Sequence, residues 1–168
     1  MSKLTNFQKR AVFTLRFFFA KSFEKAFICP KATINMPKEY AYPTRESVMF
    51  TNEIVNIMSN KKADQHKLLK SANYIDEIIE QTKQTQGDLY DKAAALMHGL
   101  ITTHGFASGN KRTGFIVTVR FLKKNGGRIR VKNFNKVERI ITNIKVYDPK
   151  EIAIWLRIGE IDETKIEH

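Results

Sequence analysis

The stretch HGFASGNKRTGF, residues 104–115, places groups suited to phosphate binding at the start of an expected helix. Asn110, Lys111 and Arg112 supply side-chain donors, and Gly109 lets the backbone approach a ligand closely. Backbone N–H groups in a first helical turn have no intrahelical acceptor and lie at the positive end of the helix dipole. Together these groups predict an anion site, most naturally for a polyphosphate.

His104 lies across the expected loop from this anion site. A neutral imidazole there can take a proton from an attacking hydroxyl, so the loop combines a general base with a phosphate cradle. That pair is the minimum set for moving a phosphorus-containing group onto an alcohol. Phe106 is expected to anchor the loop in the core. Taken singly, a histidine at a helix end is more often a cap and a Gly-Asn pair more often a turn, so the prediction depends on the joint spacing.

Helical periodicity dominates the chain on both sides of this loop. The helix that starts near residue 111 is apolar on most faces, which predicts that it is the buried centre of the domain. Gly87-Asp88, Asn125-Gly126-Gly127 and Asp148-Pro149 are expected helix boundaries, and residues 128–131 an extended piece. The pattern predicts an all-α fold with a central helix wrapped by the others. The other expected helices cover residues 44–58, 65–82, 89–104 and 134–145, with a last one from Pro149.

Length and composition fit one folded domain with an added arm. The 168 residues are 42% hydrophobic, which is enough for a core. Residues 1–43 are predicted to form a basic, aromatic-rich N-terminal arm, and residues 44–168 the catalytic domain. Apolar runs in the arm are broken by charges and fall short of the roughly 20 residues of a membrane-spanning helix. With Cys29 as the one cysteine, an intrachain disulfide is excluded, and a cytoplasmic location is expected.

Positive charge is concentrated around and after the loop. The net charge is +12, and residues 105–150 contain 12 basic and 2 acidic side chains. Such a field attracts phosphates, nucleic acid or an acidic protein. Nucleic-acid binding is therefore an alternative, based on the basic segment 120–145 with its interleaved Phe and Ile. Against it, these apolar residues follow helical spacing, which core packing explains.

The loop resembles the signature of the Fic/Doc (Fido) family, His-x-Phe-x-acidic-Gly/Ala-Asn-Gly/Lys-Arg. Residues 104–112 match it at every specified position except the acidic one, where Ser108 stands. The resemblance extends over about residues 44–158 and includes ADQHKLLKSA, residues 63–72, which is similar to the segment after the substrate-docking flap of Doc-type proteins. It implies a Fido-type helical bundle around a central buried helix and allows a short β-hairpin flap.

By this resemblance, the protein transfers a phosphate-containing group from a nucleoside triphosphate, ATP, to a Ser, Thr or Tyr hydroxyl of a target protein. His104 would be the general base. The flap that aligns the target would include Lys61, Lys62 and Asp64. The phosphates would be held by Gly109, Asn110, Lys111 and Arg112.

Lys111 distinguishes two branches of the family. AMP-transferring Fic proteins usually have Gly at that position and a second Arg where this chain has Phe115. Lys followed by Arg-Thr resembles the Doc toxin branch, which binds the nucleotide in the opposite sense and transfers the terminal phosphate. The resemblance therefore favours phosphorylation, with AMP transfer as the alternative.

Two departures from the family pattern affect activity and regulation. The acidic residue that holds Mg²⁺ in active members is Ser108 here, and a hydroxyl is a weaker ligand than a carboxylate. A degenerate nucleotide-binding protein is therefore a further alternative. In addition, no Ser or Thr has Glu four residues later, as the inhibitory helix of many Fic proteins requires. By resemblance, a toxin of this kind would need a separate antitoxin protein, for which the N-terminal arm is a candidate docking surface.

Overall fold

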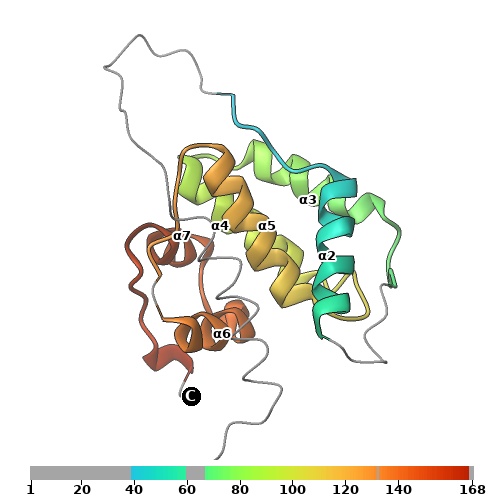
Figure 1. The fold of residues 1–168 in the computed structure, drawn as a ribbon. Coiled ribbons are helices and arrows are strands. Elements are labelled where there is room, and N and C mark those ends of the chain that lie inside the picture. The colour runs from blue at the N-terminus through green and yellow to red at the C-terminus, as the bar shows by residue number, and fades with distance from the viewer. Residues whose placement is uncertain (1–38, 60–66, 132, 167–168) are drawn as a thin grey trace, which may run out of the picture. The chain divides into compact units, whose positions relative to one another are not determined.

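The computed structural model describes residues 39–59, 67–131 and 133–166 (Figure 1). These residues form helices and irregular segments, and no strand is present among them apart from an isolated antiparallel bridge between Leu68 and Phe106. The all-α prediction is confirmed. The flap residues Lys61, Lys62 and Asp64 and the arm residues 1–38 lie outside the described residues. The helices are α2 (Arg45–Ser59), α3 (Asn73–Gln84), α4 (Leu89–Thr102), α5 (Asn110–Lys124), α6 (Phe134–Thr142) and α7 (Pro149–Ile158), with short 3-10 turns η1 (Ile144–Val146) and η2 (Thr164–Ile166).

Helices α4 and α5 form the centre of the domain. They pack against each other, α2 covers another side of α5, and α3 and α7 pack on α4 (Figure 1). The apolar faces of α5 explain this position, because Phe115, Phe121 and Leu122 are all buried. On α4, the buried side chains recur at helical spacing and include Leu96, Met97 and Leu100. The loop between the two helices therefore lies between rigid elements.

Capping residues determine where α4 and α7 begin. The Asp88 carboxylate accepts hydrogen bonds from two backbone N–H groups of α4, while the Asp91 side chain accepts from the Asp88 N–H. Asp148 and Glu151 form the same reciprocal pair at α7, where Pro149 occupies the first turn. Both starts were predicted from the sequence and are confirmed.

The helix expected over residues 65–82 is wrong in its first part. Helix α3 begins only at Asn73, and the Leu69 side chain is 61% exposed. The backbone before α3 bonds to the loop instead of to itself: Leu69 N–H donates to the Gly105 carbonyl at 2.8 Å, and Ala107 N–H donates to the Lys67 carbonyl at 2.8 Å. Helical spacing of apolar residues is present in this segment, but these non-local bonds override it.

Smaller differences occur at other boundaries. The helix before the loop ends at Thr102 rather than near residue 104, and the helix expected over 134–145 is divided into α6 and η1. Residues 128–131 form no strand; the Arg130 N–H donates to the Leu156 carbonyl at 3.3 Å. None of the described helices combines the length and apolar character needed to cross a membrane.

The segment before α2 packs against the end of α5. The ring of Tyr42 stacks on Phe121 with centroids 5.3 Å apart. The Asn125 carboxamide accepts a hydrogen bond from the Ala41 N–H at 2.8 Å and donates to the Ala41 carbonyl at 3.2 Å. The compact unit that contains the helices accordingly begins at Tyr40.

Candidate active site

Helix α5 begins at the loop without a side-chain cap. Its N-cap is Gly109, which has φ 79°, in the left-handed region that favours glycine, and the first turn contains no acidic residue. Lys111 and Arg112 lie in that first turn and are both half-buried. A helix start with cations and no competing carboxylate is an anion-binding arrangement.

The Asn110 carboxamide closes the loop. Its oxygen accepts a hydrogen bond from the Phe106 N–H at 3.0 Å, and its nitrogen donates to the Phe106 carbonyl at 2.7 Å. Both ends of the side chain thus bind the loop backbone. In this arrangement Asn110 shapes the cradle, and its contribution to a phosphate would come through its backbone N–H at the helix start.

Phe106 and Gly105 fix the loop to the core. Phe106 is 2% exposed and makes an edge contact with the Tyr74 ring at a centroid distance of 5.9 Å. A Cβ atom on Gly105 would lie 2.1 Å from a carbon of the same ring, so no larger residue fits without a shift. The backbone bonds to Lys67 and Leu69 hold the loop from a second side.

His104 lies at the exposed edge of the loop. Its φ is 49°, and it is the one described residue other than glycine with a positive φ. The left-handed conformation costs a non-glycine residue roughly 1–2 kcal/mol, and such conformations concentrate at functional sites. The His104 side chain is exposed to solvent at this point of the loop.

Two buried asparagines of α2 hold the loop from beneath, and the sequence analysis missed both. The Asn52 carboxamide donates to the Ser108 carbonyl at 2.9 Å and to the Thr113 hydroxyl at 3.0 Å. Asn56 donates to the Asn52 side-chain oxygen at 3.0 Å. Their exposed fractions are 0% and 4%. The signal available in the sequence was a pair of amides one helical turn apart, on the face of α2 that also carries Val48 and Val55.

Gly109 is required by these asparagines as well as by its φ. A Cβ atom there would lie 2.9 Å from the Asn56 side-chain oxygen and 3.1 Å from the Asn52 side-chain nitrogen. Within the described residues, that Asn56 oxygen has no hydrogen-bond partner. The close approach of α2 to the loop therefore requires glycine at position 109, because a Cβ atom there would collide with both asparagines.

Arg112 is joined to the end of α2. One of its terminal nitrogens donates to the hydroxyl of Ser59, the last residue of the helix. This bond orients the guanidinium beside the start of α5, where an Arg fork suits bidentate binding of phosphate oxygens.

Metal-ligating side chains are not clustered among the described residues. They contain no group of three or more His, Cys, Asp or Glu placed to hold a metal ion. Ser108, at the position of the family's acidic ligand, offers a hydroxyl, and its carbonyl already accepts a hydrogen bond from Asn52. A hydroxyl at position 108 suits Mg²⁺ less well than a carboxylate, because proteins usually hold Mg²⁺ through one or two carboxylates together with substrate phosphates.

Sequence comparison identifies the family. The sequence model of the Fic/DOC family matches residues 36–122, which is more than half of the chain. The chain belongs to the Fic/Doc family. The matched range contains α2, α3, α4 and most of α5, and therefore the whole loop described above. Searches of curated proteins and of solved structures gave no match.

Membership gives this Fic/Doc protein a general activity class. The family transfers nucleotide-derived groups to proteins. An exposed histidine, a glycine-capped helix start and two adjacent cations are the parts that such a transfer needs.

Proposed function

We propose that this Fic/Doc protein is a Doc-like kinase that transfers the γ-phosphate of ATP to a Ser, Thr or Tyr hydroxyl of a target protein. The observation that carries the proposal is the start of α5, where Gly109 leaves the first-turn N–H groups uncapped and Lys111 and Arg112 lie beside them. Lys111 favours the Doc branch over AMP transfer, because AMP-transferring Fic proteins usually have glycine there.

The reaction requires one proton transfer and one displacement. The His104 imidazole takes the proton of the target hydroxyl, whose oxygen forms a bond to the γ-phosphorus. The bond from that phosphorus to the bridging oxygen breaks, and ADP leaves with the electron pair. Lys111, Arg112 and the first N–H groups of α5 stabilise the charge on the phosphate oxygens.

Ser108 supports a competing proposal, a degenerate Fic/Doc protein that binds a nucleotide without transferring part of it. Because Ser108 stands at the position of the acidic ligand of active members, the cation would enter with the nucleotide and its waters if transfer occurs. Positive charge over residues 105–150 favours nucleotide binding under either proposal.

The proposal includes a cytoplasmic toxin controlled by a separate antitoxin protein. Its support is the absence from the sequence of the Ser/Thr-x-x-x-Glu pattern of self-inhibited Fic proteins. Co-expression with the protein encoded next to it, with and without residues 1–30, measures whether a partner binds the N-terminal arm. Unchanged binding of the truncated chain would exclude the arm as the docking surface.

The test of phosphorylation uses ATP labelled in parallel at the γ- and α-phosphates. Purified protein is incubated with a cell lysate and Mg²⁺, and label is followed into protein. His104→Ala is the inactive variant. His98→Ala is its matched control, because that histidine belongs to α4 and lies outside the loop.

Each outcome separates the proposals. Label from the γ position alone, lost in His104→Ala and kept in His98→Ala, supports the kinase. Label from the α position, lost in His104→Ala, indicates AMP transfer, in which the γ-phosphate leaves with pyrophosphate, and overturns the use of Lys111. Nucleotide binding without labelling supports the degenerate protein. If the protein neither labels a target nor binds a nucleotide, the kinase, AMP-transfer and degenerate proposals are all refuted. That result favours nucleic-acid binding, which the salt dependence of RNA and DNA affinity would then test.

A further inference from the structure

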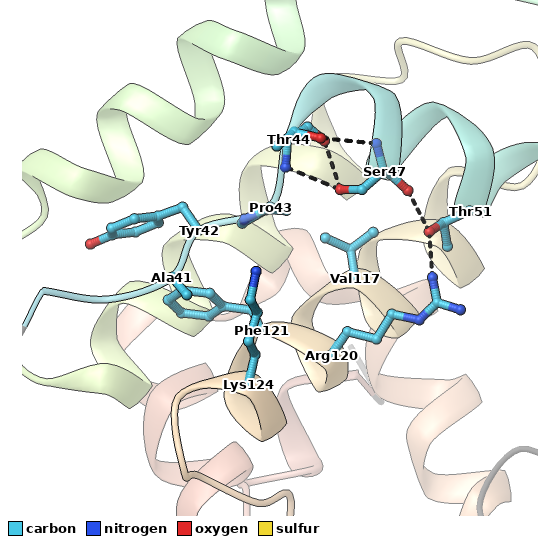
Figure 2. Close-up of a pocket in the computed structure, with 10 residues that line it drawn as sticks. All are labelled: Ala41, Tyr42, Pro43, Thr44, Ser47, Thr51, Val117, Arg120, Phe121 and Lys124. Atoms are coloured by element: carbon cyan, nitrogen blue, oxygen red, sulfur yellow. Dashed lines mark hydrogen bonds between the residues drawn. The ribbon is translucent and has the colours of Figure 1, made fainter.

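A pocket of about 220 Å³ lies along the second half of α5, away from the loop (Figure 2). It is bounded by α5 from Val117 to Lys124, by the first turns of α2, and by the segment that leads into α2 from Ala41. At 1.5 Å per residue, Val117 is about 10 Å along the helix axis from the start of α5. The pocket is therefore separate from the proposed phosphate site.

Its apolar wall is held in place by contacts on several sides. The rings of Tyr42 and Phe121 stack with an interplanar angle of 26°. The rings of Tyr40 and Phe121 make an edge contact with their centroids 6.4 Å apart. The two hydrogen bonds between Asn125 and Ala41 fix the incoming chain. A concave surface with an ordered aromatic wall is available without rearrangement, which favours binding because little entropy is lost.

The polar part of the pocket is positively charged. Arg120 and Lys124 lie one helical turn apart on the same side of α5 (Figure 2). The Arg120 guanidinium donates to the Thr51 hydroxyl at 3.0 Å, and that hydroxyl donates to the Ser47 carbonyl at 2.7 Å. None of the described residues that line the pocket is acidic.

The helix dipole explains only part of this arrangement. Lysines in a last turn stabilise the negative end of a helix, which accounts for Lys123 and Lys124. It does not account for an Arg held by a buried threonine beside an aromatic wall. The combination of an apolar depression and adjacent cations suits a ligand that is apolar at its centre and negative around it.

The volume and the aromatic contacts select the class of ligand. Small-molecule sites usually have about 300–1,000 Å³, so this pocket fits a single side chain better than a nucleotide. Stacking of nucleic-acid bases needs free aromatic faces. Here Phe121 is 2% exposed, and the Tyr42 ring already contacts Phe121 and the Lys83 ammonium, which is 6.0 Å from its centroid.

We propose that this pocket is a docking site for an acidic segment of a partner protein, which inserts one aromatic or aliphatic side chain. Carboxylates on either side of that anchor would pair with Arg120 and Lys124. The inference goes beyond the proposed transfer reaction and does not depend on it. A target protein or a controlling protein held here would leave the loop at the other end of α5 accessible.

The test uses short fluorescent peptides and the full chain. The probe contains glutamates on both sides of a central Ser-Phe-Ser, and its binding is followed by fluorescence anisotropy. Two comparison peptides replace the Phe by Gly or the glutamates by lysines. Lys124→Glu reverses one pocket charge, and Lys145→Glu is its matched control, because Lys145 is an exposed lysine of η1 outside the pocket.

We expect the acidic Phe peptide to bind at least tenfold more tightly than either comparison peptide. Lys124→Glu should weaken it at least fivefold and Lys145→Glu less than twofold, since charge pairs at a rim are worth less than a buried anchor. His104→Ala should bind like the wild type, which keeps this result separate from that of the transfer assay. The proposal would be overturned if the Gly peptide bound as tightly as the Phe peptide, or if both lysine variants weakened binding equally. It would also be overturned if RNA displaced the probe while the three peptides bound alike.

Discussion

Replacement of Asn52 by alanine should strongly destabilise the protein, because one buried carboxamide joins α2 to both the loop and α5. Asn52 donates to the Ser108 carbonyl and the Thr113 hydroxyl and accepts from Asn56. Each hydrogen bond contributes about 0.5–1.5 kcal/mol net, and a buried group left unpaired costs about 1–3 kcal/mol. Because neighbouring groups relax and recover part of these losses, their sum should lower the free energy of unfolding by about 2–4 kcal/mol.

The assay is urea unfolding followed by circular dichroism, with Asn135→Ala as the matched control. Asn135 is an exposed residue of α6, and its replacement should change the free energy of unfolding by less than about 0.5 kcal/mol. In a double-mutant cycle, Asn52→Ala and Asn56→Ala should be non-additive by at least about 0.5 kcal/mol, because they remove the same bond.

A loss below about 0.5 kcal/mol for Asn52→Ala would refute the reasoning, because two buried bonds and one part-buried bond cannot all be lost at so small a cost. A loss with fully additive double-mutant behaviour would refute the coupling between the two asparagines. Nucleotide affinity measured on the same folded variant then tests whether this support also shapes the loop.

Three further predictions concern groups outside this network. Tyr74→Phe should leave stability unchanged or raise it by up to about 1 kcal/mol in a thermal melt, because the buried Tyr74 hydroxyl has no partner among the described residues; a clear loss would reveal one. Asp148→Ala should cost about 1–2 kcal/mol in urea unfolding, because the bonds that the Asp148 side chain accepts at the start of α7 are lost, and Asp148→Asn should recover part of that. Burial holds the pKa of His98 below its usual value, and Lys145 adds to this lowering, while Asp148 opposes it. The folded state therefore binds fewer protons than the unfolded state, so the free energy of unfolding should fall as pH decreases through about 6.5. His98→Gln should reduce this pH dependence, measured by urea unfolding at several pH values.

The sequence was most informative where local chemistry decides the structure. Asp88 and Asp148 begin their helices with bonds to the next few residues, so their effect can be predicted from neighbours alone. The apolar faces of α5 likewise predict a central helix, because no other arrangement buries them all.

The sequence was least informative where backbone groups bond to distant ones. The segment with Leu68 and Leu69 has helical spacing, but its backbone is paired with Gly105 and Ala107, which lie more than thirty positions later. Similarly, nothing local to Asn52 indicates that its partner is the carbonyl of Ser108. The transfer chemistry proposed for the loop rests on side-chain types, whereas the support of the loop is visible only from the packing of α2 against α5.

The bonds at Ser59 and Lys67 attach the end of α2 and the segment before α3 to the same part of the protein. The Ser59 hydroxyl accepts from Arg112, and the Lys67 carbonyl accepts from the Ala107 N–H, so the chain is anchored on both sides of residues 60–66. Closure entropy grows slowly with loop length, by only about 0.6 kcal/mol for each doubling. Changes of length or sequence within residues 60–66 should therefore leave the stability of the anchored helices nearly unchanged.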